Sequence, residues 1–363
     1  MRIWKADEFG EAVDVLKLQE VALPDPGEGI VELQVAATGV GLPDALMVRG
    51  NYPAVSRPPV TPGQEVAGTV TRTGPGCSLK PGDFVISSTR FAEGGGGMAE
   101  YCQVYEAATL PVPKGMSAES AAGFWVPFHT GYVGVIQRGQ LQPGETLLVL
   151  GGAGSSGSAA IQLGKAVGAT VIATVSSTDK VEFCRSLGAD HVINYRETPI
   201  NEGVKQIMGK AGVEMIFDPV GGAAYAQAVK CIARHGRVIL IGYSSGEWPK
   251  VDPLNVVLRS YSLVGAFPGA RTLEETRAQH QTLCKMAEAG QIHVPIDKVF
   301  PFEEAPQAID RVAACENFRR DTVRIVIGNI EGCILAEVGL SSLWWISTFN
   351  WSQDKAIHRT SIR

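Results

Sequence analysis

Between about residue 117 and residue 242, short apolar runs alternate with longer segments whose apolar residues recur at helical spacing. The short runs predict strands at Leu147–Leu150, Thr170–Thr174, His191–Tyr195, Val213–Asp218 and Arg237–Gly242. The longer segments predict helices at Ser117–Arg138, Ser155–Val167, Lys180–Leu187, Ile200–Met208 and Ala223–Ile232. Strands and helices that alternate in this way are typical of right-handed βαβ units, so we predict an α/β fold with a doubly wound parallel sheet.

The parts of the chain on either side of this region have a different pattern. Residues 1–120 carry short β-like runs between Gly and Pro residues, at Ile30–Ala37, Glu65–Val70 and Asp83–Ile86. This rhythm predicts a compact β-rich domain. After about Pro268, a long polar helix over Leu273–Ala289 and a terminal strand over Val323–Ile327 are expected. We expect this last part to rejoin the first domain.

The turn that follows the strand at Leu147–Leu150 is dense in glycine and fits the pattern G-x-G-x-x-G. With 42 glycines in the chain, the pattern is informative only because it stands between a strand and a helix. The glycines allow a tight turn and a close approach of the backbone to a pyrophosphate, and the helix presents free N–H groups to that anion. The predicted dinucleotide contacts are Gly152, Ala153, Gly154, Ser155, Ser156 and Gly157.

The end of the second predicted strand favours NADPH over NADH. A carboxylate about twenty residues after the glycines is typical of NAD sites, but Ser176 and Ser177 occupy this position. Hydroxyl groups can bond to a 2′-phosphate, and Lys180 one turn later can neutralise it. Asp179 is the competing acid, and we expect it within the first turn of the next helix. The alternative for Lys180 is an ordinary solvated lysine.

Length and composition narrow the class of protein. The 363 residues suffice for two domains, and 45% of them are hydrophobic. The net charge is −5 without a Lys or Arg run, which argues against a nucleic-acid partner. The seven cysteines are scattered, as is typical of reduced intracellular thiols. With no apolar core of a signal peptide and no run of membrane-spanning length, we expect a soluble cytoplasmic protein without a membrane partner.

Several further motifs stand in order along the chain, at Gly39–Pro53, Pro58–Val70, Leu187–Tyr195, Asp218–Gly222 and Gly236–Gly242. Together with the glycine turn, they resemble the medium-chain dehydrogenase/reductase superfamily, and within it the zinc-free quinone oxidoreductase (zeta-crystallin-like) branch. The resemblance covers about Met1–Ile327. It implies a GroES-like substrate domain formed by residues 1–122 and 268–327, and a Rossmann NADPH-binding domain formed by residues 123–267. Residues 328–363 are an atypical tail, either an appended element or an artefact of translation.

The resemblance also implies an active site in the cleft between the two domains and a homodimer built by pairing of sheet edges. Further cofactor contacts carried over by position are Thr130, Ser176, Lys180, Tyr195, Gly242, Phe267, and Arg319 or Arg324. Gly242 and Phe267 are expected on the nicotinamide side.

Two departures from related sequences bear on the chemistry. Zinc-dependent relatives read G-H-E where this chain has Gly63-Gln64-Glu65, and they place a cysteine near Gly41. The four-cysteine lobe that binds structural zinc is also missing, so we expect no metal. Many quinone reductases carry an asparagine where Gly41 stands, which leaves the identity of the substrate open.

Without a metal, the expected reaction is direct hydride transfer from the nicotinamide to an electron-poor acceptor. The proton can come from solvent or from Tyr52, whose alternative role is packing in its loop. Asp44 is the second candidate catalytic residue, and its alternative role is to cap a helix over Ala45–Arg49. His129 is expected to be a core residue or to support the site indirectly.

Three functions follow from these observations. The first is an NADPH:quinone reductase. The second is an NADPH-dependent reductase of enones or enoyl thioesters, which would need a wider pocket with a basic rim, for which Arg90 and Arg271 are candidates. The third is a non-catalytic NADPH-binding protein, a binding or structural protein that keeps the fold without turnover. The nearly intact glycine fingerprint argues against this third function, and a failure to bind NADPH would favour a purely structural protein.

Overall fold

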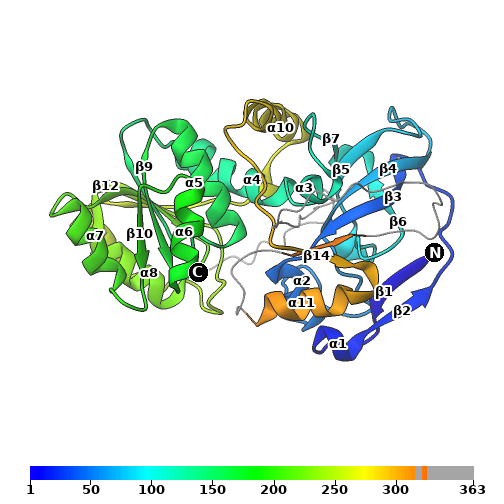
Figure 1. Cartoon of the computed structure of the whole chain (residues 1–363), viewed down its shortest axis with the longest axis horizontal. Coiled ribbons are helices and arrows are strands. Elements are labelled where there is room, and N and C mark those ends of the chain that lie inside the picture. The colour runs from blue at the N-terminus through cyan, green and yellow to red at the C-terminus, as the bar shows by residue number, and fades with distance from the viewer. Residues whose placement is uncertain (315–320, 325–363) are drawn as a thin grey trace, which may run out of the picture.

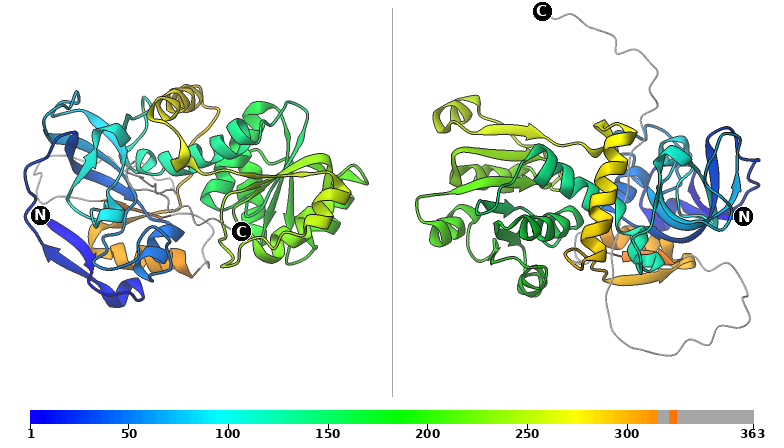
Figure 2. Two further views of the ribbon diagram at one scale, coloured as in Figure 1. Left: turned by 180° about the vertical axis from the view of Figure 1, so that it is seen from behind. Right: turned by 90° about the horizontal axis from the view of Figure 1, so that it is seen from above.

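The computed structural model describes residues 1–314 and the backbone of 321–324. The chain forms two halves, each built on one large sheet, and helix α10 (Leu273–Glu288) lies between them (Figure 1). Seen from behind and from above, the two halves again lie side by side with α10 at their junction (Figure 2). Within the described residues, no helix combines the length and apolar character needed to cross a membrane.

One half, formed by the middle of the chain, contains a six-stranded sheet in which every neighbouring pair is parallel. Its strands, in spatial order, are β10 (His191–Asn194), β9 (Thr170–Val175), β8 (Thr146–Val149), β11 (Val213–Asp218), β12 (Ile232–Leu240) and β13 (Ser262–Gly265). Numbered along the chain within this sheet, the order is 3-2-1-4-5-6, which is that of dinucleotide-binding folds. The predicted doubly wound parallel sheet is confirmed.

Helices cover both faces of this sheet because its central strand is apolar on both sides. Leu147 packs in one cluster with residues of α5 (Ser155–Val167) and α6 (Thr178–Ser186). Leu148, on the opposite face, packs with residues of α7 (Ile200–Met208) and α8 (Gly222–Ala228). The remaining elements of this half are the 3₁₀ turn η4 (Val229–Cys231) and α9 (Pro253–Arg259).

The other half, formed by the early and late parts of the chain, is rich in β-structure. Its large sheet has the order β14 (Lys298–Pro301), β15 (Asp321–Arg324), β3 (Ile30–Gly39), β4 (Glu65–Thr73), β5 (Phe84–Ser88) and β7 (Thr109–Pro111), and β6 (Tyr101–Tyr105) also pairs with β3. A separate two-stranded antiparallel sheet pairs β1 (Arg2–Ala6) with β2 (Leu16–Glu20). The helices and 3₁₀ turns here are α1 (Ala12–Val15), α2 (Leu42–Val48), η1 (Phe91–Glu93), η2 (Glu106–Ala108), η6 (Phe302–Glu304) and α11 (Ala305–Ala313). The pairing of β15 with β3 brings the late part of the chain into the sheet formed by the first part.

The segment that joins the halves differs from its prediction. The single helix expected over Ser117–Arg138 is instead α3 (Ala118–Ala122), α4 (Trp125–Gly131) and the π-helix η3 (Tyr132–Arg138). Gly123 ends α3, and the restart at Trp125 places Pro127 in the first turn of α4, where its missing N–H costs little. The segment after β13 contains the 3₁₀ turn η5 (Pro268–Ala270), followed by α10.

Candidate active site

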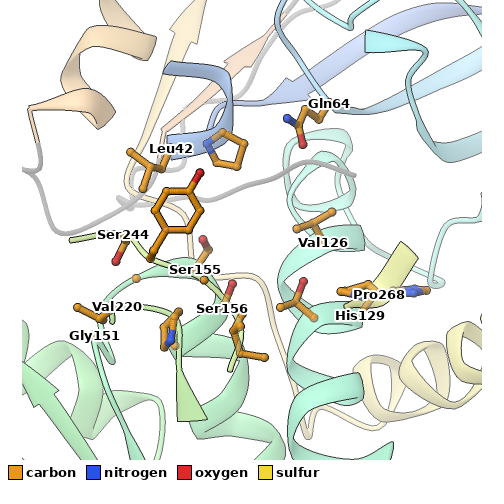
Figure 3. Close-up of a pocket in the computed structure, with 18 of the residues that line it drawn as sticks. Leu42, Gln64, Val126, His129, Gly151, Ser155, Ser156, Val220, Ser244 and Pro268 are labelled. Carbon is orange, nitrogen blue, oxygen red and sulfur yellow. The ribbon is translucent and has the colours of Figure 1, made fainter. Parts of the chain in front are cut away.

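A pocket of about 660 Å³ is lined by residues from both halves of the molecule. From the parallel sheet, it is lined by loops that follow the carboxyl ends of β8, β9, β11 and β12, where ligands bind in such sheets. In Figure 3, Gly151, Val220 and Ser156 lie on one side of the pocket, and Leu42 and Gln64 lie across from them. The site therefore depends on the way in which the two halves face each other.

The glycine turn is shaped by two close approaches of the backbone. A Cβ atom on Gly152 would lie 2.7 Å from Cβ of Ala173, and one on Gly157 would lie 2.3 Å from the carbonyl oxygen of Gly151. Both distances are far below van der Waals contact, so only glycine allows α5 to start this close to β8 and β9. Gly152, predicted to contact the cofactor, is not among the residues that line the pocket, because it packs against Ala173 of β9 instead. The members of the motif that line the pocket are Ala153, Gly154, Ser155, Ser156 and Gly157.

The same turn presents the start of α5 to the pocket. Gly154 precedes the helix, and no side chain caps its first turn. The first backbone N–H groups of a helix lack acceptors within the helix and carry the positive end of its dipole. Ser155 and Ser156 occupy these first positions and line the pocket. The observed cradle and the uncapped N–H groups thus fit the pyrophosphate of a dinucleotide.

A second polar group of the pocket lies at the end of β9. Nζ of Lys180 donates a hydrogen bond to Oγ of Ser176, and both residues line the pocket together with Tyr195. Ser177 stands just before α6, and Asp179 lies in the first turn of that helix, as expected. Neither of these two residues lines the pocket.

Three of the remaining predicted cofactor contacts lie at the same site. Thr130, Gly242 and Phe267 line the pocket. Arg319 lies outside the described residues, as does the tail 328–363, and of Arg324 only the backbone is described, in β15 beside β3.

Of the two predicted catalytic residues, only Tyr52 lines the pocket. The carboxylate of Asp44 is fully buried at the start of α2 and accepts hydrogen bonds from the backbone N–H groups of Gly41 and Gly63, each at 2.7 Å. This placement favours the capping alternative for Asp44 over a catalytic role, because both carboxylate oxygens bind backbone N–H groups and Asp44 does not line the pocket.

Burial and hydrogen bonding set the state of the Tyr52 phenol. Burial raises the pKa of Tyr52 above its ordinary value, and the nearby Asp44 carboxylate acts in the same direction, while a hydrogen bond with Gln64 opposes the shift. The phenol of Tyr52 therefore stays protonated at neutral pH and can donate a hydrogen bond into the pocket.

Other pocket residues were not singled out from the sequence. Pro219, Val220, Tyr243 and Ser244 follow the carboxyl ends of β11 and β12, a position that the strand prediction could have flagged. Leu42, Trp125 and Val126 carry no local signal, because only the tertiary fold brings them to the pocket. His129 lines it too, although its ring is buried, in keeping with the expected core position.

Among the described residues, no group of three or more His, Cys, Asp or Glu side chains is arranged to hold a metal ion. The side chain of Gln64 stands where zinc-dependent relatives have a histidine. Its Nε2 contacts Sδ of Met47 at 3.6 Å, in the buried wall of the pocket.

Two family models match the chain. One is described as "Alcohol dehydrogenase GroES-like domain" and matches residues 27–114. The other is described as "Zinc-binding dehydrogenase" and matches residues 157–283. The expected combination of a Rossmann sheet with a GroES-like domain is thereby confirmed.

Relatives and solved structures agree with the family models. Mouse "Quinone oxidoreductase-like protein 2" is 31% identical over 319 residues, covering 85% of this chain and 88% of the relative. Human "Quinone oxidoreductase" is 27% identical over 314 residues, covering 86% and 94%. The structure of Escherichia coli quinone oxidoreductase complexed with NADPH has a TM-score of 0.83 at 25% identity, covering 89% of this chain and 100% of that chain. The chain therefore belongs to the quinone oxidoreductase branch of the medium-chain dehydrogenase/reductase superfamily.

Proposed function

We propose that this protein is an NADPH-dependent oxidoreductase that reduces a quinone by hydride transfer without a bound metal. One observation carries the proposal. A single pocket combines the glycine turn at the start of α5, the pair of Ser176 and Lys180, and an apolar wall that contains Tyr52. Such a pocket offers room for a dinucleotide and for a second, apolar ligand beside it.

The residues on the sheet side fit NADPH. Ala153–Gly157 would hold the pyrophosphate, and Ser176, Lys180 and Tyr195 would hold the phosphate at the adenosine end. Thr130, Gly242 and Phe267 would hold the nicotinamide end. When bound, NADPH supplies a hydride, and with one proton this converts a quinone to a hydroquinone. Solved relatives support this choice, since both the Escherichia coli enzyme and a mycobacterial protein of 28% identity and TM-score 0.82 are complexes with NADPH.

The residues of the β-rich half would position the acceptor. Leu42, Pro43 and Leu46 offer an apolar surface, and the protonated phenol of Tyr52 offers a hydrogen bond to a carbonyl oxygen. A quinone accepts hydride without a Lewis acid. The replacement of a histidine ligand by Gln64, and of a cysteine ligand by Gly41, supports the metal-free proposal.

We also propose that the protein forms a homodimer through the edge of the parallel sheet. Strand β13 ends that sheet, and the adjacent helix α9 exposes Leu254 by 63%, Val257 by 71% and Leu258 by 74%. Three exposed apolar side chains on one short helix are typical of a surface that another chain covers. Light scattering should give a dimer mass for the wild type and a monomer mass for Leu258→Glu. Val13→Glu on α1, which is 47% exposed, is the control and should stay dimeric.

The test of the function is anaerobic NADPH consumption by the purified protein with a small para-quinone, next to an alkenal and an NADH control. Turnover with the quinone supports the proposal. Turnover with the alkenal alone would move the assignment to an enone reductase. NADPH binding without turnover of either acceptor would favour a non-catalytic NADPH-binding protein.

A further inference from the structure

Arg271 lines the pocket, and among the described residues its guanidinium group has no carboxylate within ion-pair distance. Its Nε donates to the carbonyl oxygen of Pro268 at 2.8 Å, and its Nη2 lies 3.3 Å from Nδ1 of His129. Its Nη1 is buried and has no hydrogen-bond partner among the described residues.

Two buried histidines fix the polar surroundings of Arg271. Nε2 of His280 lies 2.7 Å from the carbonyl oxygen of Pro111, which can only accept, so Nε2 of His280 carries the proton. Nδ1 of His280 is then an acceptor, and Nε2 of His129 donates to it at 3.1 Å. Nδ1 of His129 is left to accept from Arg271. This chain of hydrogen bonds uses two neutral imidazoles, so it orients the guanidinium but does not neutralise it.

Glu275, four residues after Arg271, is the acid whose charge acts on this guanidinium group, and its carboxylate is already engaged. The carboxylate of Glu275 accepts a hydrogen bond at 2.8 Å from the backbone N–H of Thr272, in the capping box that starts α10. Burial lowers the pKa of Arg271 to about 10, so the group still carries its charge at neutral pH. A buried cation with an unpaired N–H group is costly unless a ligand supplies the missing negative charge.

We propose that Arg271 recognises an oxyanion, a carboxylate or a phosphate, on a ligand of this pocket. The anion can belong to the acceptor or to the cofactor, and the position of Arg271 favours the acceptor. Its partners His129 and Pro268 lie together on the side of the pocket away from Gly151 and Val220 (Figure 3). An anion on the acceptor makes the substrate an electron-poor compound that bears a carboxylate or a phosphate. This part of the inference rests on the proposed function.

Binding of a matched pair of probes tests this proposal without requiring turnover. Isothermal titration calorimetry would compare 2-naphthoate with neutral 2-naphthamide, each added to the protein with NADPH present, and NADPH would be titrated separately. Arg271→Met removes the charge and keeps an apolar stem. Arg138→Met is the control, because Arg138 also donates from Nε to a backbone oxygen, that of Gly265 at 3.1 Å, but does not line the pocket.

The wild type and Arg138→Met should bind 2-naphthoate about tenfold or more tightly than the amide, and Arg271→Met should lose this preference. Arg271→Lys should regain part of it, which a merely structural role would not produce. A roughly tenfold weaker binding of NADPH to Arg271→Met, with equal binding of both probes throughout, would assign the anion to the cofactor. Equal binding of both probes with unchanged NADPH affinity would overturn the proposal, whatever acceptors the enzyme reduces.

Discussion

Lys180 donates a hydrogen bond from Nζ to the hydroxyl of Ser176, which lies one turn before it at the carboxyl end of β9. The pair places a cation and a hydroxyl group in the pocket where NAD-binding folds have a carboxylate. The bond holds both groups on the pocket wall. This relationship is the structural basis of the proposed preference for a 2′-phosphate.

Replacement of Lys180 by alanine should therefore raise the KM for NADPH and leave the use of NADH nearly unchanged. We expect the KM to rise about tenfold. This is the lower end of the effect typical for the loss of a hydrogen bond to a charged group, because Lys180 is partly exposed to solvent. Steady-state kinetics with both cofactors measures the effect. Equal losses with NADPH and NADH would contradict the assignment of Lys180 to the 2′-phosphate.

Two alanine substitutions in the glycine turn should separate packing from ligand binding. In Gly157→Ala, the new Cβ meets backbone atoms at 2.3 Å and 3.0 Å, so the fold should lose about 1–3 kcal/mol of stability. In Gly154→Ala, the nearest atom lies at 3.1 Å and the methyl group enters the pocket wall, so NADPH affinity should fall with little change in melting temperature. Thermal melts and NADPH titrations distinguish the two. A large fall in melting temperature for Gly154→Ala alone would show that this assignment of roles is wrong.

The phenol of Tyr52 should contribute a hydrogen bond rather than an easily released proton. Because burial raises the pKa of Tyr52, the protonated form persists through pH 10, and kcat/KM should show no loss from this group up to that pH. Tyr52→Phe should lower kcat/KM roughly tenfold at constant cofactor affinity. A wild-type pH profile that falls between pH 8 and 9 and becomes flat in Tyr52→Phe would contradict this view.

The buried histidine pair should make the protein less stable in mild acid. Burial lowers the pKa of His129 and of His280 below 6.5, and for His129 the positive charge of Arg271 acts in the same direction. Below about pH 6.5 the unfolded chain takes up protons that the folded chain excludes, so stability is complete above that pH and is lost as the pH falls. Urea midpoints between pH 7.5 and 5.5 should fall more steeply for the wild type than for His280→Gln. His191→Gln replaces an exposed histidine and is the control, which should behave like the wild type. If the urea midpoint of the wild type fell no more steeply than that of His280→Gln, the prediction would be contradicted.

Local sequence patterns predicted much of the parallel sheet and the residues of this sheet that line the pocket. The helices at Ser155–Val167 and Ile200–Met208 and the strand at Val213–Asp218 have the predicted bounds. Strand β13 was not predicted, because its four residues end in glycine and form an edge without a clear apolar pattern. The single helix expected over Ser117–Arg138 was wrong, because α3 ends at Gly123, the chain begins a new helix at Trp125 and then continues as the π-helix η3.

By itself, the sequence determined the order of strands and helices and the glycine turn, because side-chain periodicity and backbone freedom act over a few neighbouring residues. Only the tertiary structure decided which distant side chains share the pocket. It buried Asp44 away from the pocket, left Tyr52 on the pocket wall, and placed Arg271 against His129 across 142 residues of chain. Contacts of this kind depend on how the two halves of the fold face each other. Local patterns of residues extend over only a few neighbours and do not determine that arrangement.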